Sequence, residues 1–195
     1  MVIASFLLLH ITNHLFALGG PGLHIAVMNL FRHVYRFPPV EIVLLISVLI
    51  QIISGITLVL KKRFLKQPFY VFMQIFTGLY LSFFMVYHVR AVMLGRFVWK
   101  ANTDFYFAAG VANRYPEKLF FIPYYMLSLV CVFAHIACAH YVRRKEMLGK
   151  MPVTHRTEQL HRQYKREAAG ICIAGAVVTF LIMIAFSGVL YDIDR

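Results

Sequence analysis

Charged residues are scarce in this chain of 195 residues, and acidic ones are the scarcest. Only 14% of the residues are charged, with 8 Asp and Glu against 20 Lys and Arg, whereas 61% are hydrophobic. A soluble domain of this size does not need so large an apolar fraction. The composition therefore indicates an integral membrane protein. Its net charge of +12 indicates connectors that meet anionic membrane lipid, and not a nucleic-acid partner.

Cysteine is also rare, and so are the sequence motifs of several cofactor sites. Cys131, Cys138 and Cys172 are odd in number and lie in apolar runs, which argues against a disulfide framework. Cys131 and Cys138 share a helix face with His135, but apolar packing is a better interpretation of these thiols than a metal site. The chain lacks iron–sulfur cysteine spacing, the C-x-x-C-H motif of covalent haem, and the glycine motifs of nucleotide sites.

Five apolar runs are long enough, or nearly so, to cross a bilayer, which takes about 20 residues. They cover residues 2–18, 40–60, 69–94, 119–142 and 168–190. No internal repeat and no separate soluble domain is evident. The sequence thus predicts an all-α fold, an integral membrane bundle of five transmembrane helices that forms one domain over residues 1–195.

The connectors carry their own structural signals. The pattern from His24 to Tyr35 predicts a short amphipathic helix at the membrane interface. The loop 98–118 is rich in aromatic residues, and we expect it to fold back over the outer mouth of the bundle. The segment 143–167 is predicted as a basic connector that contains a short surface helix over 157–167.

The distribution of Lys and Arg predicts the orientation. The second and fourth connectors carry four and eight of these residues, whereas the first and third carry two and four. Basic connectors stay in the cytoplasm, so we expect the N-terminus inside and the C-terminus outside. The expected location is the bacterial inner (cytoplasmic) membrane.

Two histidines lie at matching depth inside apolar runs. His10 precedes Gly19 by nine residues, and His88 precedes Phe97, the outer end of the third run, by nine residues. Imidazole is costly in hydrocarbon unless it is paired, so both should face the bundle. Two imidazoles at one depth on two helices can bind one iron from opposite sides, as in a bis-histidine haem. His10 and His88 are therefore candidate metal ligands of one haem in the outer half of the membrane.

Other polar residues are candidates for supporting roles. His14 lies one turn from His10, ~6 Å along the helix axis, and is a candidate cofactor-binding residue as a propionate or quinone contact. It is also a candidate to be the ligand in place of His10. Arg90 can reach the outer interface, and on charge alone it is a candidate partner of a haem propionate, as are Arg32 and Arg36.

The remaining histidines are interpreted without a cofactor. His135 lies deep in the fourth run and has no histidine opposite it, so it reads as a core histidine that hydrogen-bonds to a neighbouring helix. The others are interpreted as surface residues: His24, His33, His140, His155 and His161.

The motif MQIFTGLYLSFFMVYHV resembles the Q-x-x-T/S-G…F-x-x-x-H helix of a known family. This family comprises the cytochrome b membrane anchors of succinate dehydrogenases and fumarate reductases, in the single-chain, five-helix form that holds two b haems. FLLLHITNH, VEIVLLISVLIQIISGITLVL and VCVFAHIACA resemble its first, second and fourth helices, in the same order. Through the third-helix motif, Thr77 and Gly78 become candidate cofactor-binding residues.

The resemblance implies a ligand arrangement. The family pairs its first and third helices around the outer haem, which corresponds to His10 and His88. It pairs the second and fourth around the inner haem, but this chain has Gln51 where the family has a histidine, and His135 is left without that partner. Glutamine is a poor haem ligand, so we expect one haem b.

The expected function is that of a b-type haem cytochrome of a respiratory chain that transfers single electrons, to or from quinone. It would be an electron-transfer component or a quinone-linked oxidoreductase subunit without catalytic side chains of its own. One alternative is a membrane anchor that docks a soluble flavoprotein or iron–sulfur subunit, with haem mainly structural. Another is a haem-free transporter or assembly factor that uses its histidines as proton carriers.

Overall fold

The computed structural model describes residues 2–61 and 66–193. All regular structure among these residues is helical, which confirms the predicted all-α fold. The helices are α1 (Val2–Leu15) with the 3-10 turn η1 (Phe16–Gly19), α2 (Pro21–Tyr35), α3 (Pro38–Lys61), α4 (Phe69–Met93) with the π-helical η3 (Leu94–Val98), α5 (Phe105–Asn113), α6 (Lys118–Leu148) and α7 (His155–Phe186). Five of these segments, α1 with η1, α3, α4 with η3, α6 and α7, are long and apolar enough to cross a membrane.

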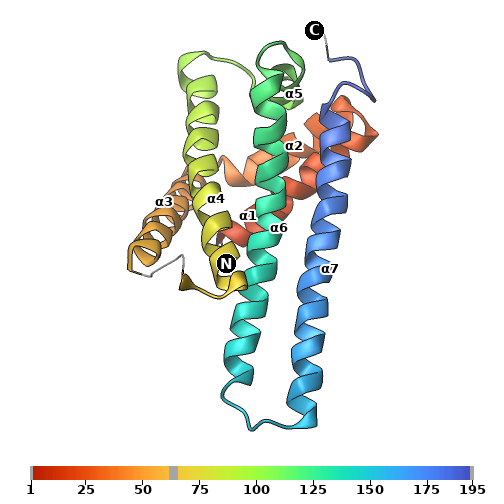
Figure 1. Cartoon of the computed structure of the whole chain (residues 1–195). Helices are drawn as coiled ribbons and strands as arrows, with labels where there is room; N and C mark the ends of the chain where they lie inside the picture. The colour runs from red at the N-terminus through yellow and green to blue at the C-terminus, as the bar shows by residue number, and fades with distance from the viewer. Residues whose placement is uncertain (1, 62–65, 194–195) are drawn as a thin grey trace.

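The helices α4, α6 and α7 stand side by side, with α6 in the middle (Figure 1). The helix α3 lies on the outer side of α4 and contacts α1, α2 and α4. The N-terminal helix α1 packs against α2, α3 and α7, so it links the two sides of the bundle. This arrangement brings the histidines of α1, α2 and the C-terminal part of α4 to one region.

The helices α6 and α7 approach each other closely at a glycine. A Cβ atom built on Gly175 would lie 2.3 Å from the Cβ atom of Phe133. Small residues allow such approach between membrane helices, where packing and not hydrophobicity drives association. The buried face of α7 continues through Ala168, Thr179 and Ala185.

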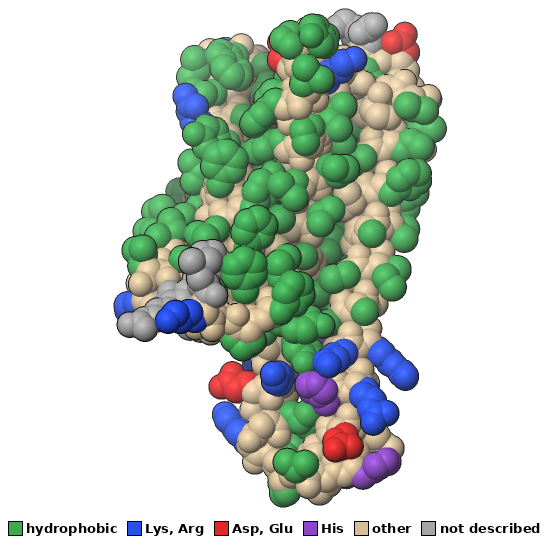
Figure 2. All heavy atoms as spheres, in the orientation of Figure 1, with side chains coloured by type: hydrophobic (Ala, Val, Ile, Leu, Met, Phe, Trp, Pro, Cys, Tyr) green, Lys and Arg blue, Asp and Glu red, His purple; other side chains and the backbone are tan. Residues whose placement is uncertain are grey.

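The segment 143–167, expected as a connector, is mostly a continuation of two helices. Residues 143–148 extend α6, and α7 begins at His155, so the turn between the two helices covers only residues 149–154. Thr154 and Thr157 form a reciprocal capping box that starts α7. The Lys, Arg, Glu and Gln residues that follow favour helix, so a polar composition did not end the helix here. Figure 2 shows this charged end projecting beyond the apolar surface.

The loop 98–118 contains a helix that the sequence reading did not predict. The Asp104 carboxylate accepts a hydrogen bond from the backbone N–H of Tyr106 at 3.0 Å and caps the start of α5. Phe105 and Ala109 are fully buried against the ends of α1 and α7. The Asn113 amide donates to the Phe186 carbonyl at 2.8 Å. The expected fold-back over the bundle thus takes the form of a packed helix.

Replacing Gly175 by Ala is expected to lower the midpoint of thermal unfolding in detergent, with a cost of about 1–3 kcal/mol, because the new methyl group would overlap Phe133. Gly170→Ala on the same helix is the matched control, because no atom lies within 4 Å of its added Cβ. Both replacements gain the same helix propensity, up to about 1 kcal/mol. Equal midpoints for the two variants would contradict the close contact.

Candidate functional site

Four histidine side chains gather where α1, α2 and α4 meet. His10 and His14 come from α1, His24 from α2 and His88 from α4. The ring centroids of His10 and His88 lie 6.0 Å apart, those of His10 and His14 lie 4.5 Å apart, and those of His14 and His24 lie 5.5 Å apart. The structure therefore brings the three histidines proposed from the sequence into one cluster and adds a fourth.

The spacing of His10 and His88 fits two ligands of one metal. Two imidazoles that bind a metal from opposite sides, each through a nitrogen about 2 Å away, have ring centres roughly 6 Å apart. The two rings are 6.0 Å apart and inclined at 71°. Each one stacks on an aromatic ring one turn earlier on its own helix: Phe6 on His10 at 5.4 Å and Phe84 on His88 at 5.1 Å. These stacked rings hold the imidazole orientations.

A hydrogen-bonded chain connects His10 to α2. The Asn13 amide nitrogen lies 3.1 Å from His24 Nε2. The amide N–H donates, so His24 Nε2 is the acceptor. His14 Nδ1 lies 3.4 Å from the same His24 Nε2, a longer contact to a nitrogen whose single lone pair faces Asn13. His14 Nε2 lies 3.2 Å from His10 Nε2, so one of these two nitrogens donates and the other accepts. Metal binding through His10 Nε2 would exchange this hydrogen bond for the metal bond, with the ring proton on Nδ1.

His24 is buried, so its interpretation as a surface residue was wrong. Only 2% of the residue is exposed, and Met28, one turn later on the same face of α2, is buried with it. Burial, and then the positive charge of Arg32, lower the pKa of His24 to about 4, against an opposing effect of Asp104. His24 is therefore neutral at pH 7 and able to accept the hydrogen bond of Asn13. The i, i+4 spacing of His24 and Met28 was the available sequence signal.

Thr77 and Gly78 lie beside His135 and not beside His10 and His88. His135 Nδ1 lies 2.9 Å from the carbonyl oxygen of Gln74, to which it donates, and 3.2 Å from Thr77 Oγ1. A Cβ atom on Gly78 would lie 3.1 Å from His135 Cε1, so the glycine lets the ring approach α4. His135 has hydrogen-bond partners on the neighbouring helix, as a core histidine does. The cofactor roles of Thr77 and Gly78 stay a prediction.

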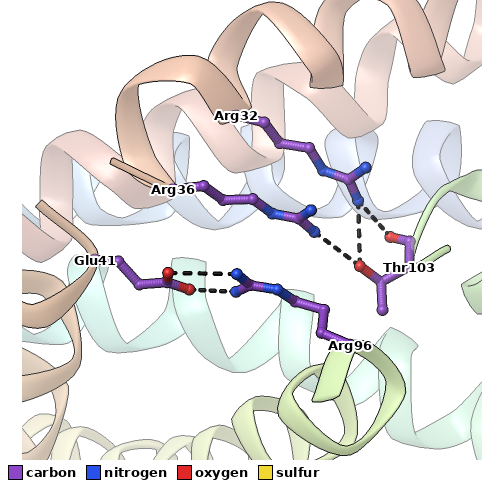
Figure 3. A network of polar contacts seen from close by, with 5 residues as sticks. All are labelled: Arg32, Arg36, Glu41, Arg96 and Thr103. Atoms are coloured by element: carbon purple, nitrogen blue, oxygen red, sulfur yellow. Dashed lines mark hydrogen bonds and ion pairs between the residues drawn. The ribbon is translucent and has the colours of Figure 1, made fainter. Parts of the chain in front are cut away.

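Among the described residues, Gln51 and the arginines make no hydrogen bond to the histidine cluster. Gln51 is exposed on α3, and α4 lies between α3 and α6, the helix of His135 (Figure 1). Arg90 is also exposed. Arg32 and Arg36 extend towards Thr103, the residue that precedes the cap of α5 (Figure 3).

The number of protein ligands restricts the kind of metal centre. Among residues 2–61 and 66–193, no group of three or more His, Cys, Asp or Glu side chains is arranged to hold a metal ion. Cys131, His135 and Cys138, which share a face of α6, are among the described side chains to which this finding applies. A site with two protein ligands suits a metal whose other ligands come from a cofactor, as the four porphyrin nitrogens do in haem. The His10–His88 pair is of this kind.

Replacing Arg32 by Gln is expected to raise the pKa of His24 from about 4, because one of the charges that oppose its protonation is removed. NMR of the protein with isotope-labelled histidine rings measures the titration, with His24→Gln as the assignment variant. Arg114→Gln, a change at an exposed cation of the 98–118 segment, serves as the control. An unchanged His24 midpoint in the Arg32 variant would contradict the electrostatic coupling.

Comparison of the chain with protein-family models, with curated proteins and with solved structures found no match.

Proposed function

We propose that this protein is a b-type haem membrane cytochrome that transfers single electrons, to or from quinone. One haem b would be held between α1 and α4 by the ring nitrogens of His10 and His88. The observation that carries the proposal is the 6.0 Å separation of these two rings, which come from helices far apart in the sequence. Because an imidazole in hydrocarbon needs a partner, their meeting inside apolar helices favours a functional site.

The residues around the pair have definable tasks in this function. When bound, haem supplies reversible one-electron chemistry at its iron. Phe6 and Phe84 stack on the ligand rings and orient them. When His10 binds the iron, His14 Nε2 loses its contact with His10 Nε2. In the tautomer that carries its proton on Nε2, His14 can then donate to a propionate or to a quinone oxygen.

The charged end of α6 and α7 supports an orientation in a bacterial inner membrane. Of the 20 Lys and Arg residues, eight lie in 143–166, at the end that projects beyond the apolar surface (Figure 2). Cytoplasmic segments carry such an excess. We therefore place this end in the cytoplasm, with the N-terminus on the same side and the haem towards the outer half.

Replacing either His10 or His88 by Ala is expected to remove the b-type absorbance bands, because one axial ligand is lost. The measurement is a reduced-minus-oxidised spectrum of the purified protein, with a pyridine haemochrome assay for haem content. His135→Ala is the matched control: it is also a membrane-helix histidine, but its nitrogen is hydrogen-bonded to Gln74. This variant should keep its haem.

Three results would go against this assignment. A colourless protein that takes up no added haem would end the proposal and favour proton transfer along the chain from His10 through His14 to His24. Loss of haem in the His135 variant would indicate that haem binds at His135 on α6. A haem content near two per chain would overturn the interpretation of Gln51.

Replacing His14 by Ala is expected to leave the haem in place and to shift its reduction potential, because a polar group beside the His10 ring is lost. A potentiometric titration followed by absorbance measures this shift, with His33→Ala on the exposed side of α2 as the control. If His14→Ala removes the haem and His10→Ala does not, His14 is the iron ligand and His10 is the neighbouring polar group.

A second candidate function is a membrane anchor for a soluble flavoprotein or iron–sulfur subunit. The observation that favours it is the projecting, basic end of α6 and α7, which offers a docking surface outside the apolar band (Figure 2). Gentle purification from the native membrane distinguishes the two functions. Co-purification of a flavoprotein or iron–sulfur protein would favour the anchor, and quinone-dependent oxidation of haem in the isolated chain would favour the cytochrome.

A further inference from the structure

Arg32 in the last turn of α2 and Arg36, the residue that caps its C-terminus, meet at one oxygen atom. Arg36 Nη2 donates to Thr103 Oγ1 at 2.9 Å, and Arg32 Nη2 donates to the same oxygen at 3.3 Å (Figure 3). Arg32 Nη2 also donates to the Thr103 carbonyl at 2.8 Å, and its Nη1 lies 3.4 Å from Asn102 Oδ1. All of these acceptors are neutral. We call Arg32 and Arg36 the arginine pair.

The positive charges near Thr103 are only partly compensated. The neighbouring Arg96 forms an ion pair with Glu41 (Figure 3). Asp104 is occupied with the start of α5 and with the Asn102 amide, which donates to it at 2.9 Å. No described carboxylate therefore forms an ion pair with Arg32 or Arg36. Two like charges that share one neutral acceptor repel each other, and an anion bound between them would relieve this repulsion.

Two further properties of the arginine pair point to an anionic ligand. Arg32 Nε is buried and donates to no atom of the described residues, which leaves a hydrogen bond unmade. Burial, and then the charges of Arg32 and Arg96, lower the pKa of Arg36, against smaller opposing effects of Tyr35 and Glu41. The first property leaves a donor without an acceptor, and the second arises in part from neighbouring positive charges. An anionic oxygen group can accept from such a donor and offset such charges.

The surroundings of the arginine pair are those of a membrane boundary. Val34, Phe37, Val98 and Trp99 are each more than half exposed on the adjoining ends of α2 and α4. The helix α3, which starts beside the pair, has no buried residue and presents its apolar side chains outward. Aromatic rings and arginines gather at the level of lipid head groups, and an uncovered apolar helix face is suited to acyl chains.

We infer that Arg32 and Arg36 form a binding site for the phosphate of an anionic membrane phospholipid whose acyl chains lie along α3. Guanidinium groups bind phosphate oxygens through paired, charge-assisted hydrogen bonds, and a net negative head group matches two positive charges. The partly exposed position beside α3 favours a lipid over a haem propionate, because a propionate would approach from the His10–His88 side. The inference does not depend on the proposed haem.

Native mass spectrometry of the detergent-released protein, titrated with phosphatidylglycerol, tests the site. The wild type should retain one lipid that the double variant R32Q/R36Q binds about thirtyfold more weakly, at about 1 kcal/mol for each arginine lost. R114Q is the matched control, because Arg114 is an exposed cation of the 98–118 segment. It should bind like the wild type, and R32K/R36K, which keeps both charges, should bind more tightly than R32Q/R36Q.

The wild type provides a test that does not depend on the folding of the variants. Phosphatidylglycerol should raise its midpoint of thermal unfolding more than phosphatidylcholine does. Equal shifts with the two lipids, or equal affinity of the double variant and R114Q, would overturn the inference. Saturation by millimolar inorganic phosphate alone would show a free-anion site and no lipid site. Loss of haem with unchanged lipid binding in R32Q/R36Q would assign the arginines to a propionate.

Discussion

One constraint shapes the interior: an imidazole within apolar helices is out of reach of water, so a hydrogen-bond partner in the protein stabilises it. His135 meets this constraint through the Gln74 carbonyl, across the contact between α4 and α6. His10 and His14 meet it through each other and through His24, where α1, α2 and α4 converge. These hydrogen bonds fix which faces of the helices point inward, and the apolar faces that remain form the outer surface.

Close packing provides the frame for this arrangement. The contact of Gly175 with Phe133 brings α6 and α7 together, and α4 lies on the other side of α6. The helix α1 links α3 to α7, so His10 is held by the packing of several helices and not by a loop. This packing brings the His10 and His88 rings to a centroid separation of 6.0 Å.

The polar groups of the protein serve different needs at different depths. Among the apolar helices, His10, His14 and His88 gather with His24 in a cluster of imidazole rings. At the boundary, Arg32 and Arg36 concentrate positive charge on neutral acceptors beside exposed apolar side chains. The separation follows from solvation, because guanidinium groups lie where head groups or water can reach them, whereas neutral imidazoles tolerate the interior when they are paired.

Hydropathy alone determined the all-α class and the five long apolar helices. The similar depth of His10 and His88 is a prediction, made because a constant helical rise converts sequence position into depth. Only the tertiary structure decided that His24 is buried, that α5 exists within the 98–118 segment, and that Thr77 lies against His135. These features depend on contacts between residues far apart in the chain. Periodicity within one segment shows which face of a helix is polar, but it does not show which other helix that face will meet.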